Sequence, residues 1–349
     1  ELKKYIEDIN VKSVLTAHPT QFYPDNVLAI ITDLTEAIKN NNLLDIKNYL
    51  TQLAKTSFFK YKKPTPLDEA VSLIWYLENV FYQSFGNTYD YIKENVFNNK
   101  DFNNNLMSVG FWPGGDRDGN PFVTPEITLQ VAERLKRTII KNYYRDIREL
   151  KRRLTFKGVE DKLINIQDKL HEYIFLRNSK NTFSSKHLMD GLQQIKLIII
   201  KDHQSLYLNL VDSLINKVKL FGSHFATMDI RQDSRVHNNV FNEIVKTSIK
   251  NKLDLFPNNY FELIETEQIQ YLSKVKGSID LSNFSDKLVL NTLNTIKAIK
   301  KIQTTNGEKA ANRYIISNNK TALNVMQLFA MLKLVAFDKD LTIDICPLF

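Results

Sequence analysis

The sequence predicts an α/β protein that is mainly helical. Long segments with apolar residues at helical spacing alternate with short apolar or β-branched segments. Four of the five short segments are followed at once by polar side chains that could carry chemistry. Parallel strands joined through helices bring their carboxyl ends, and the ligands bound there, to one edge of a sheet. This layout is typical of an α/β barrel or of an open α/β sheet.

The five short segments are the expected strands. Each is apolar or β-branched, as expected for a strand that is buried on both faces. They are Ser13–Thr16, Leu106–Trp112, His224–Arg231, Tyr314–Ser317 and Thr342–Leu348.

The longer segments are the expected helices. Thr124, Pro125 and Glu126 form a clear helix start, with a capping residue, a proline at the first helical position and an acid in the first turn. An apolar residue then recurs every four positions from Ile127 to Ile147, which indicates one buried helix face. Further helices are expected over Asp25–Leu50, Leu67–Ile92, Glu160–Leu176, Ser185–Val218, Val236–Ile249, Lys287–Gln303 and Thr321–Leu332.

Composition narrows the class of protein. The single cysteine, Cys346, cannot form an intramolecular disulfide, which favours a reducing compartment and therefore the cytoplasm. No apolar run approaches the roughly 20 residues of a membrane span, so no membrane association is expected. The net charge of +8 fits either a polyanion partner or an anion-handling site on a lysine-rich surface. The densest basic run, Lys136–Arg153, reads mostly as a solvated helix face, and nucleic-acid binding is not expected.

His18 follows the first expected strand, in "SVLTAHPTQ". Pro19 forces an extended or turn geometry on it and stops the strand. A histidine fixed at a strand end can move a proton near neutral pH; the alternative is a histidine that only hydrogen-bonds a neighbouring loop.

The loop "GGDRDGNP" follows the second expected strand. Four of the ten glycines of the chain lie between Gly110 and Gly119. Its glycines and Arg117 could cradle a phosphate, and Asp116 and Asp118 could bind a metal. The third interpretation, favoured for the two acids, is structural: the glycines permit turns, and Asp–Arg pairs lock the loop beneath a site.

Arg231 ends the third expected strand, in "FATMDIRQDS". An arginine there could clamp a phosphate or carboxylate, or it could pair with Asp229 or Asp233 for stability. Two histidines, His224 and His237, flank this strand and remain further candidates.

Taken in order, "VLTAHPTQ", "GFWPGGDRDGNPFVT" and "MDIRQDS" resemble bacterial-type phosphoenolpyruvate carboxylase. The segments "YIISNNKTALNVMQLFAMLK" and "ICPLF" are similar to two further blocks of that family. The resemblance runs from Val14 to Phe349. It implies strands of a TIM-like (β/α) barrel, present in part and separated by long helical insertions.

The resemblance also implies a reaction and residue roles. Phosphoenolpyruvate and bicarbonate give oxaloacetate and phosphate with Mg²⁺ or Mn²⁺, through carboxyphosphate and the enolate of pyruvate. His18 matches the essential histidine of the family and is expected to handle the proton of the carboxylation half. Arg231 matches a phosphate contact, while Asp116 and Arg117 are expected to be scaffold or electrostatic support. A homotetramer is the implied assembly.

The chain departs from the family pattern in two places. Gln21 stands where the family usually has an acid. The metal-binding acids and a mobile glycine- and arginine-rich loop are expected beyond Phe349, so residues 1–349 are expected to be one domain portion without the second half of the barrel. By itself this portion is expected to be inactive and to associate through unpaired strands. The alternative is a non-catalytic anion-binding or regulatory module of the same fold.

Overall fold

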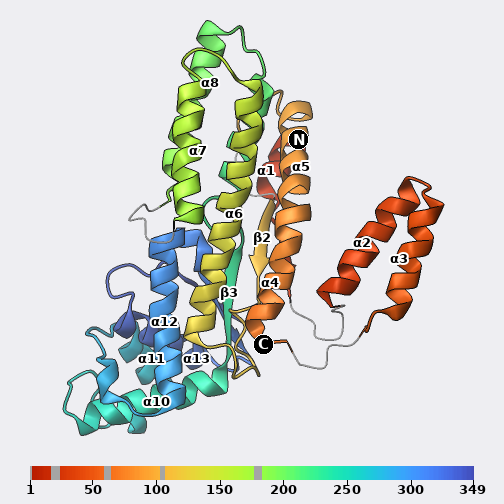
Figure 1. Ribbon diagram of the computed structural model, residues 1–349. Coiled ribbons are helices and arrows are strands. Elements are labelled where there is room, and N and C mark those ends of the chain that lie inside the picture. Colours follow the sequence, from red (N-terminus) through yellow and green to blue (C-terminus); the bar gives the residue numbers. More distant parts are fainter. Residues whose placement is uncertain (1, 17–23, 59–63, 103–106, 177–182) are drawn as a thin grey trace.

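A computed structural model describes residues 2–16, 24–58, 64–102, 107–176 and 183–349 (Figure 1). His18 and Gln21 lie outside these ranges. The described part is mostly helical and contains one small sheet, which confirms the predicted mainly helical α/β class.

The sheet has five parallel strands that follow one another in chain order. They are β1 (Val11–Leu15), β2 (Met107–Phe111), β3 (Thr227–Asp233), β4 (Arg313–Ser317) and β5 (Asp344–Pro347). Each overlaps one of the five segments predicted as strands. Among these strands β1 and β5 each have a single neighbour, so the sheet is open at both.

The two faces of the sheet differ in chemistry. The face that carries Phe111, Ile230 and Tyr314 is buried and apolar. The opposite face carries Lys12, Asp229, Arg231, Arg313 and Asp344, as the strand register and side-chain alternation require. The prediction that the strands are buried on both faces was therefore wrong for the two edge strands, since β1 and β5 contain no buried residue.

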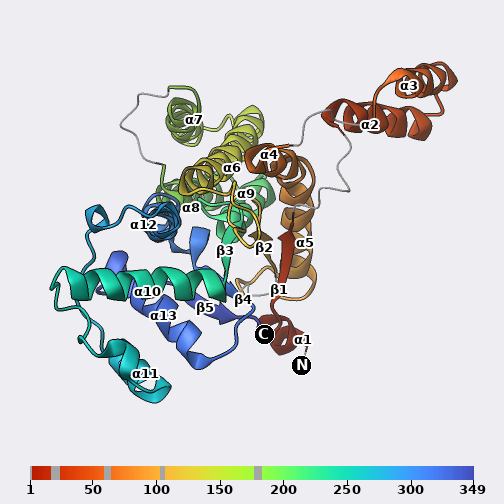
Figure 2. The same cartoon turned by 90° about the horizontal axis from the view of Figure 1, so that it is seen from below.

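Helices cover the apolar face. Figure 2 shows α4, α5, α6 and α9 grouped beside β1–β3, with α10, α12 and α13 beside β4 and β5. The paired helices α2 and α3 lie apart from the rest in both views. The bounds are α1 Leu2–Asp8, α2 Asp25–Lys39, α3 Leu43–Lys55, α4 Pro66–Tyr76, α5 Tyr82–Asn95, α6 Pro125–Arg153, α7 Glu160–Phe175, α8 Ser185–Asp202, α9 Leu208–Phe221, α10 Ser234–Lys250, α11 Glu265–Ser273, α12 Lys287–Asn306 and α13 Ala322–Val335.

Three predicted helices are interrupted. Asp25–Leu50 is split between α2 and α3, and Ser185–Val218 is split between α8 and α9. Leu67–Ile92 contains a π-helical turn at Leu77–Phe81. Asn41, in the first break, and Gln204 and Ser205, in the second, have positive φ angles, which end a right-handed helix while the apolar pattern continues on both sides.

The predicted start of α6 is confirmed. Thr124 is its N-cap and accepts a hydrogen bond from the backbone N–H of Ile127. The stripe through Val131, Leu135 and Ile139 is buried in the main core. Within the described ranges, no helix is both long and apolar enough to span a bilayer.

Candidate active site at the strand ends

The GGDRDGNP loop is joined to the end of β3 by its backbone. The carbonyl of Trp112 accepts hydrogen bonds from the N–H groups of Gly115 and Asp116, at 2.8 and 2.9 Å, which closes a tight turn directly after β2. The Arg117 N–H donates to the carbonyl of Arg231 at 2.9 Å, and the Arg231 N–H donates to that of Gly115 at 3.1 Å. The loop thus extends the ladder between β2 and β3 beyond their paired residues.

Two glycines make this approach possible. A Cβ atom at Gly115 would lie 2.3 Å from the carbonyl oxygen of Asp229 on β3. Gly114 has a φ of +79°, and a Cβ there would lie 2.6 Å from the side chain of Val131 on α6. Only glycine fits both the backbone contact and the left-handed turn.

Arg231 is held by the two acids of the loop. Its guanidinium lies 3.0 Å from the carboxylate of Asp118 and 3.7 Å from that of Asp116. The sequence analysis had named Asp229 or Asp233 as its ion-pair partner, and neither of these two acids pairs with Arg231. The buried Nε of Arg231 has no hydrogen-bond partner among the described residues.

Asp116 is the less firmly paired of the two acids. Its Oδ1 accepts a hydrogen bond from the Asp118 N–H at 3.1 Å, which fixes the bend between them. Burial raises the pKa of the Asp116 carboxyl, although this hydrogen bond and Arg231 act in the opposite direction. Burial outweighs Arg231 here because that pair is separated by 3.7 Å.

Arg117 points away from the strand ends. Its side chain is buried and donates to the Thr295 hydroxyl at 2.7 Å and to the Val123 carbonyl at 3.3 Å. Burial lowers the pKa of its guanidinium. The fork for an anion that one interpretation assigned to Arg117 is therefore turned into the protein, and Arg117 ties the loop to α12.

Asp229 is a member of this cluster that the sequence did not single out as a site residue. Its carboxylate is buried, with Oδ1 2.9 Å from Lys12 Nζ and Oδ2 accepting from the indole N–H of Trp112 at 3.1 Å. The Trp112 ring in turn lies beneath the Arg231 guanidinium, 5.1 Å from centroid to carbon. Alternation along β3 could have placed Asp229 and Arg231 on one face.

The two flanking histidines lie in a different environment. His237 is fully buried, faces the hydroxyl of Tyr314 at 3.1 Å, and has a pKa lowered to about 3 by burial. Burial, with Lys309 and Lys12 nearby, lowers the pKa of His224 to about 4. Both are therefore neutral at pH 7, and neither is suited to exchange protons there.

The strand ends that carry the other two motifs meet β1 at the same edge. The Trp112 N–H donates to the carbonyl of Leu15, the last residue of β1, at 3.0 Å. His18 follows Leu15 by three positions in the chain, outside the described residues.

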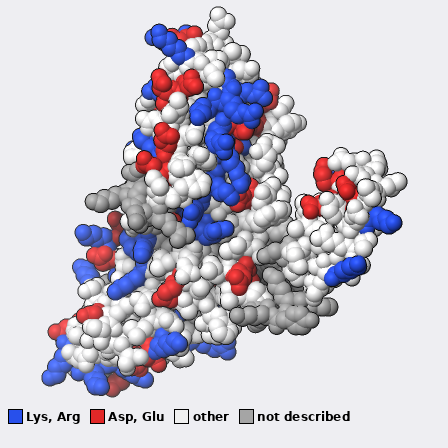
Figure 3. Space-filling model, in the orientation of Figure 1, with Lys and Arg blue, Asp and Glu red and all other residues white. Residues whose placement is uncertain are grey.

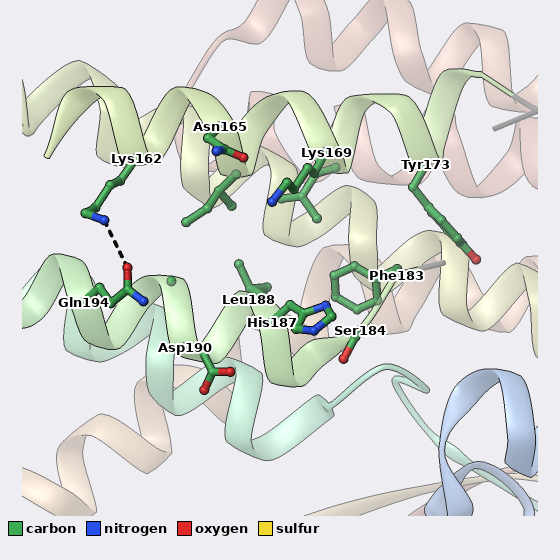
Figure 4. A pocket seen from close by; sticks show the side chains of 13 residues that line it. Lys162, Asn165, Lys169, Tyr173, Phe183, Ser184, His187, Leu188, Asp190 and Gln194 are labelled. Carbon is green, nitrogen blue, oxygen red and sulfur yellow. Dashed lines mark hydrogen bonds between the residues drawn. The ribbon is translucent and has the colours of Figure 1, made fainter. Parts of the chain in front are cut away.

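A groove elsewhere in the molecule contains none of these residues. It lies between α7 and α8 and has a volume of about 610 Å³ (Figure 4). Its rim carries Lys162, which donates to Gln194, together with Lys169 and His187. All of its lining residues lie between Lys162 and Gln194, so the groove is lined by none of the residues of the cluster around Arg231.

A metal ion does not fit the acids of the loop. The carboxylates of Asp116 and Asp118 face the guanidinium of Arg231, which already supplies their counter-charge. Over the described ranges there is no group of three or more histidine, cysteine or acidic side chains that could hold a metal.

A parallel sheet with a carboxylate-paired arginine at its carboxyl edge defines the class of protein: an α/β protein with a cluster of charged side chains at its strand ends. The sequence model of the phosphoenolpyruvate carboxylase family matches residues 1–177 and 153–349. Together these matches span the chain, and the chain belongs to this family.

Curated proteins similar to this chain belong to the same family. A phosphoenolpyruvate carboxylase of Aliivibrio salmonicida is 25% identical over 99% of this chain, and one of Nitrosomonas eutropha is 24% identical over 100%. One of Shewanella loihica is 26% identical over 69% of the chain. These relatives bear the name of a carboxy-lyase. The chain spans 43%, 44% and 32% of their respective lengths, less than half of each.

Proposed function

We propose that the protein containing this chain carboxylates phosphoenolpyruvate with bicarbonate and forms oxaloacetate and phosphate. The observation that carries the proposal is the meeting of the end of β1, the GGDRDGNP loop and Arg231 at one edge of the sheet, in a chain of this family. We further propose that the five strands are part of a TIM-like barrel, because their sequential parallel order suits one.

Arg231 is the proposed contact for the substrate phosphate. A guanidinium presents several N–H donors in a fixed fork and stays charged at all physiological pH values. Two carboxylates and an aromatic ring hold this one, so it is oriented before the substrate arrives. Asp116 and Asp118 are thereby proposed to position Arg231, and Arg117 to hold the loop on α12.

His18 is the proposed proton-handling residue. The phosphoryl group passes from the enol oxygen to bicarbonate, and the carboxyl carbon then bonds to the methylene carbon of the enolate as phosphate leaves. A histidine near this second step can take up the bicarbonate proton because its ordinary pKa lies close to neutrality. Among the described residues, no group of three or more histidine, cysteine or acidic side chains could hold the divalent metal of the proposed reaction.

The test is oxaloacetate formation by the product of the full reading frame that contains this chain, with phosphate release measured separately. His18→Asn should lower oxaloacetate formation about 100-fold or more while phosphate release continues, because only the carboxylation half needs the proton transfer. His171→Asn, on the exposed side of α7, is the matched control and should change neither rate. A folded, metal-supplied wild type that makes no oxaloacetate would refute the proposal and favour an anion-binding module.

A further inference from the structure

A buried carboxylate links two parts of the strand-end cluster. Asp229 is only 2% exposed, and each of its oxygens has a partner in the described part of the chain: Lys12 on β1 and the indole N–H of Trp112. Burying a carboxylate is costly unless it is paired and hydrogen-bonded, so this carboxylate strongly favours one position of each partner.

Trp112 connects Asp229 to Arg231, because its indole binds the first and contacts the second. Its backbone begins the GGDRDGNP turn, and its ring lies beneath the Arg231 guanidinium. A rotation of the indole would break the hydrogen bond to Asp229 and remove the aromatic face from beneath the cation. The carboxylates of Asp116 and Asp118 pair with the two terminal nitrogens of the guanidinium and restrict its movement from that side.

We propose that Asp229 is a positioning residue, which fixes the Trp112 indole as the platform that orients Arg231 toward an anionic substrate group. The inference rests on the proposed function, in which Arg231 binds the phosphate of phosphoenolpyruvate. Asp229 itself does not touch the substrate; it acts through Trp112.

The variants remove the link without leaving a buried unpaired charge. Asp229→Leu combined with Lys12→Met replaces the buried pair by apolar groups, a change that folds often tolerate. Asp229→Asn with Lys12→Met restores an acceptor for the indole N–H. Trp112→Phe keeps an aromatic ring and removes the donor.

The chain offers a control of similar chemistry among its helices, although its carboxylate is more exposed than that of Asp229. Asp146 accepts from Lys217 Nζ at 3.0 Å and from the Tyr82 hydroxyl at 2.8 Å, and Lys217 lies over the Tyr82 ring. This is the same kind of carboxylate–lysine–aromatic unit, away from the strand ends. Asp146→Leu with Lys217→Met therefore measures the effect of removing a carboxylate–lysine pair at a place away from the strand ends.

The first measurement is steady-state kinetics of the full reading frame product. The Asp229→Leu pair should raise the KM for phosphoenolpyruvate about tenfold, equivalent to about 1.4 kcal/mol, with a smaller change in kcat. The double variant Asp229→Asn with Lys12→Met should recover most of the affinity. Trp112→Phe should raise the KM, as the double variant with Asp229→Leu does. The control pair should leave KM unchanged. A KM that is equal in the Leu pair and the control would overturn the inference.

The second measurement needs no turnover. Trp75 and Trp112 are the two tryptophans of the chain, so Trp75→Phe leaves Trp112 as the only reporter within it. The same full-length product is used, with any further tryptophan outside this chain replaced by phenylalanine. The Leu pair should lower the fluorescence anisotropy of Trp112, and the control should not. An unchanged anisotropy would contradict the inference.

Direct binding of phosphoenolpyruvate separates this inference from the proposed reaction. If the wild type binds phosphoenolpyruvate without making oxaloacetate, and the Leu pair binds it about tenfold more weakly, the positioning role stands and the reaction is refuted. If the wild type makes oxaloacetate and the Leu pair has an unchanged KM, the reaction stands and the positioning role is refuted. If the wild type does not bind phosphoenolpyruvate at all, both are refuted.

Discussion

Gly115 shows how much one position decides at the residue scale. The carbonyl oxygen of Asp229 occupies the place where its side chain would begin, and a backbone oxygen cannot move aside cheaply. Gly115→Ala should therefore push the loop off β3, weaken phosphoenolpyruvate binding and lower the free energy of unfolding by about 1–3 kcal/mol. Urea denaturation measures the stability, and the KM reports the binding.

The control for that prediction lies four residues further on. Gly119 has a φ of +68°, and no atom lies within 4 Å of the position that a Cβ would take, so an alanine there meets backbone strain and no steric contact. Gly119→Ala should lower the free energy of unfolding by about 1–2 kcal/mol and leave the affinity for phosphoenolpyruvate unchanged. Equal loss of affinity in both variants would contradict the close-approach argument for Gly115.

His237 should make stability depend on pH. Its folded pKa of about 3 lies below the ordinary value of 6.5, so the unfolded chain binds more protons between these two pH values. The stability that depends on neutral His237 is fully present above pH 6.5. As the pH falls toward 3, the free energy of unfolding decreases by at most about 1.4 kcal/mol per pH unit. Denaturation of wild type and His237→Gln between pH 7.5 and 5 should show a shallower slope for the variant; equal slopes would contradict the assignment.

Partner choice at this scale was only partly predictable. The motif order identified Arg231 and the loop acids, and the structural interpretation of the acids anticipated Asp–Arg pairing. Local proximity suggested Asp229 and Asp233 as partners of Arg231, yet Asp233 caps α10 and pairs with Arg235, while Asp229 binds Lys12 and Trp112. Contacts between β3 and residues more than 100 positions away are not encoded in local sequence.

At the scale of elements, helix ends were set by recognisable caps. The Asp286 carboxylate accepts from the N–H groups of Leu288 and Val289 at 2.7 and 3.0 Å, at the start of α12. Asp286→Ala should lower the free energy of unfolding by about 1 kcal/mol, measured by urea denaturation.

A helix without a side-chain cap gives the comparison. Ser184 precedes α8 and makes no capping hydrogen bond. Ser184→Ala should therefore change the stability by a few tenths of a kcal/mol at most, well below the value for a working cap. A loss at Ser184 as large as that at Asp286 would show that the caps are not the cause.

Helix existence was more predictable than helix continuity. The apolar period ran through the α2–α3 and α8–α9 breaks, and the positive-φ residues that separate the helices do not interrupt it. The helices α1 and α11 were not predicted, because both are short. Helices this short are marginal on their own propensity, so local sequence signals predict them poorly.

At the scale of the whole molecule, charge and strand edges govern association. Lysine and arginine lie over much of the α6 face in Figure 3, with acidic side chains interspersed, and Glu78 pairs with both Lys141 and Arg145. Such a mixed surface is typical of solvated helices and does not by itself favour a polyanion partner.

The open sheet should favour association of residues 1–349 when they are produced alone. Among the described strands, β1 and β5 each leave one edge unpaired, and the polar sheet face beside them is partly exposed. Size-exclusion chromatography with light scattering should show species larger than a monomer. A single stable monomer at micromolar concentration would contradict this.

Local signals along the chain were enough to establish the mainly helical α/β class, the five strands, most helices and the family, because apolar periodicity, caps and ordered motifs can each be read without knowing the fold. Packing in three dimensions selected the partner of each charged residue and the polar face of the sheet, and it turned Arg117 inward. It also brought Asp229, Trp112 and Lys12 together at the site. These outcomes depend on contacts between strands that are distant in the chain, where burial makes an unpaired charge costly and so selects one arrangement.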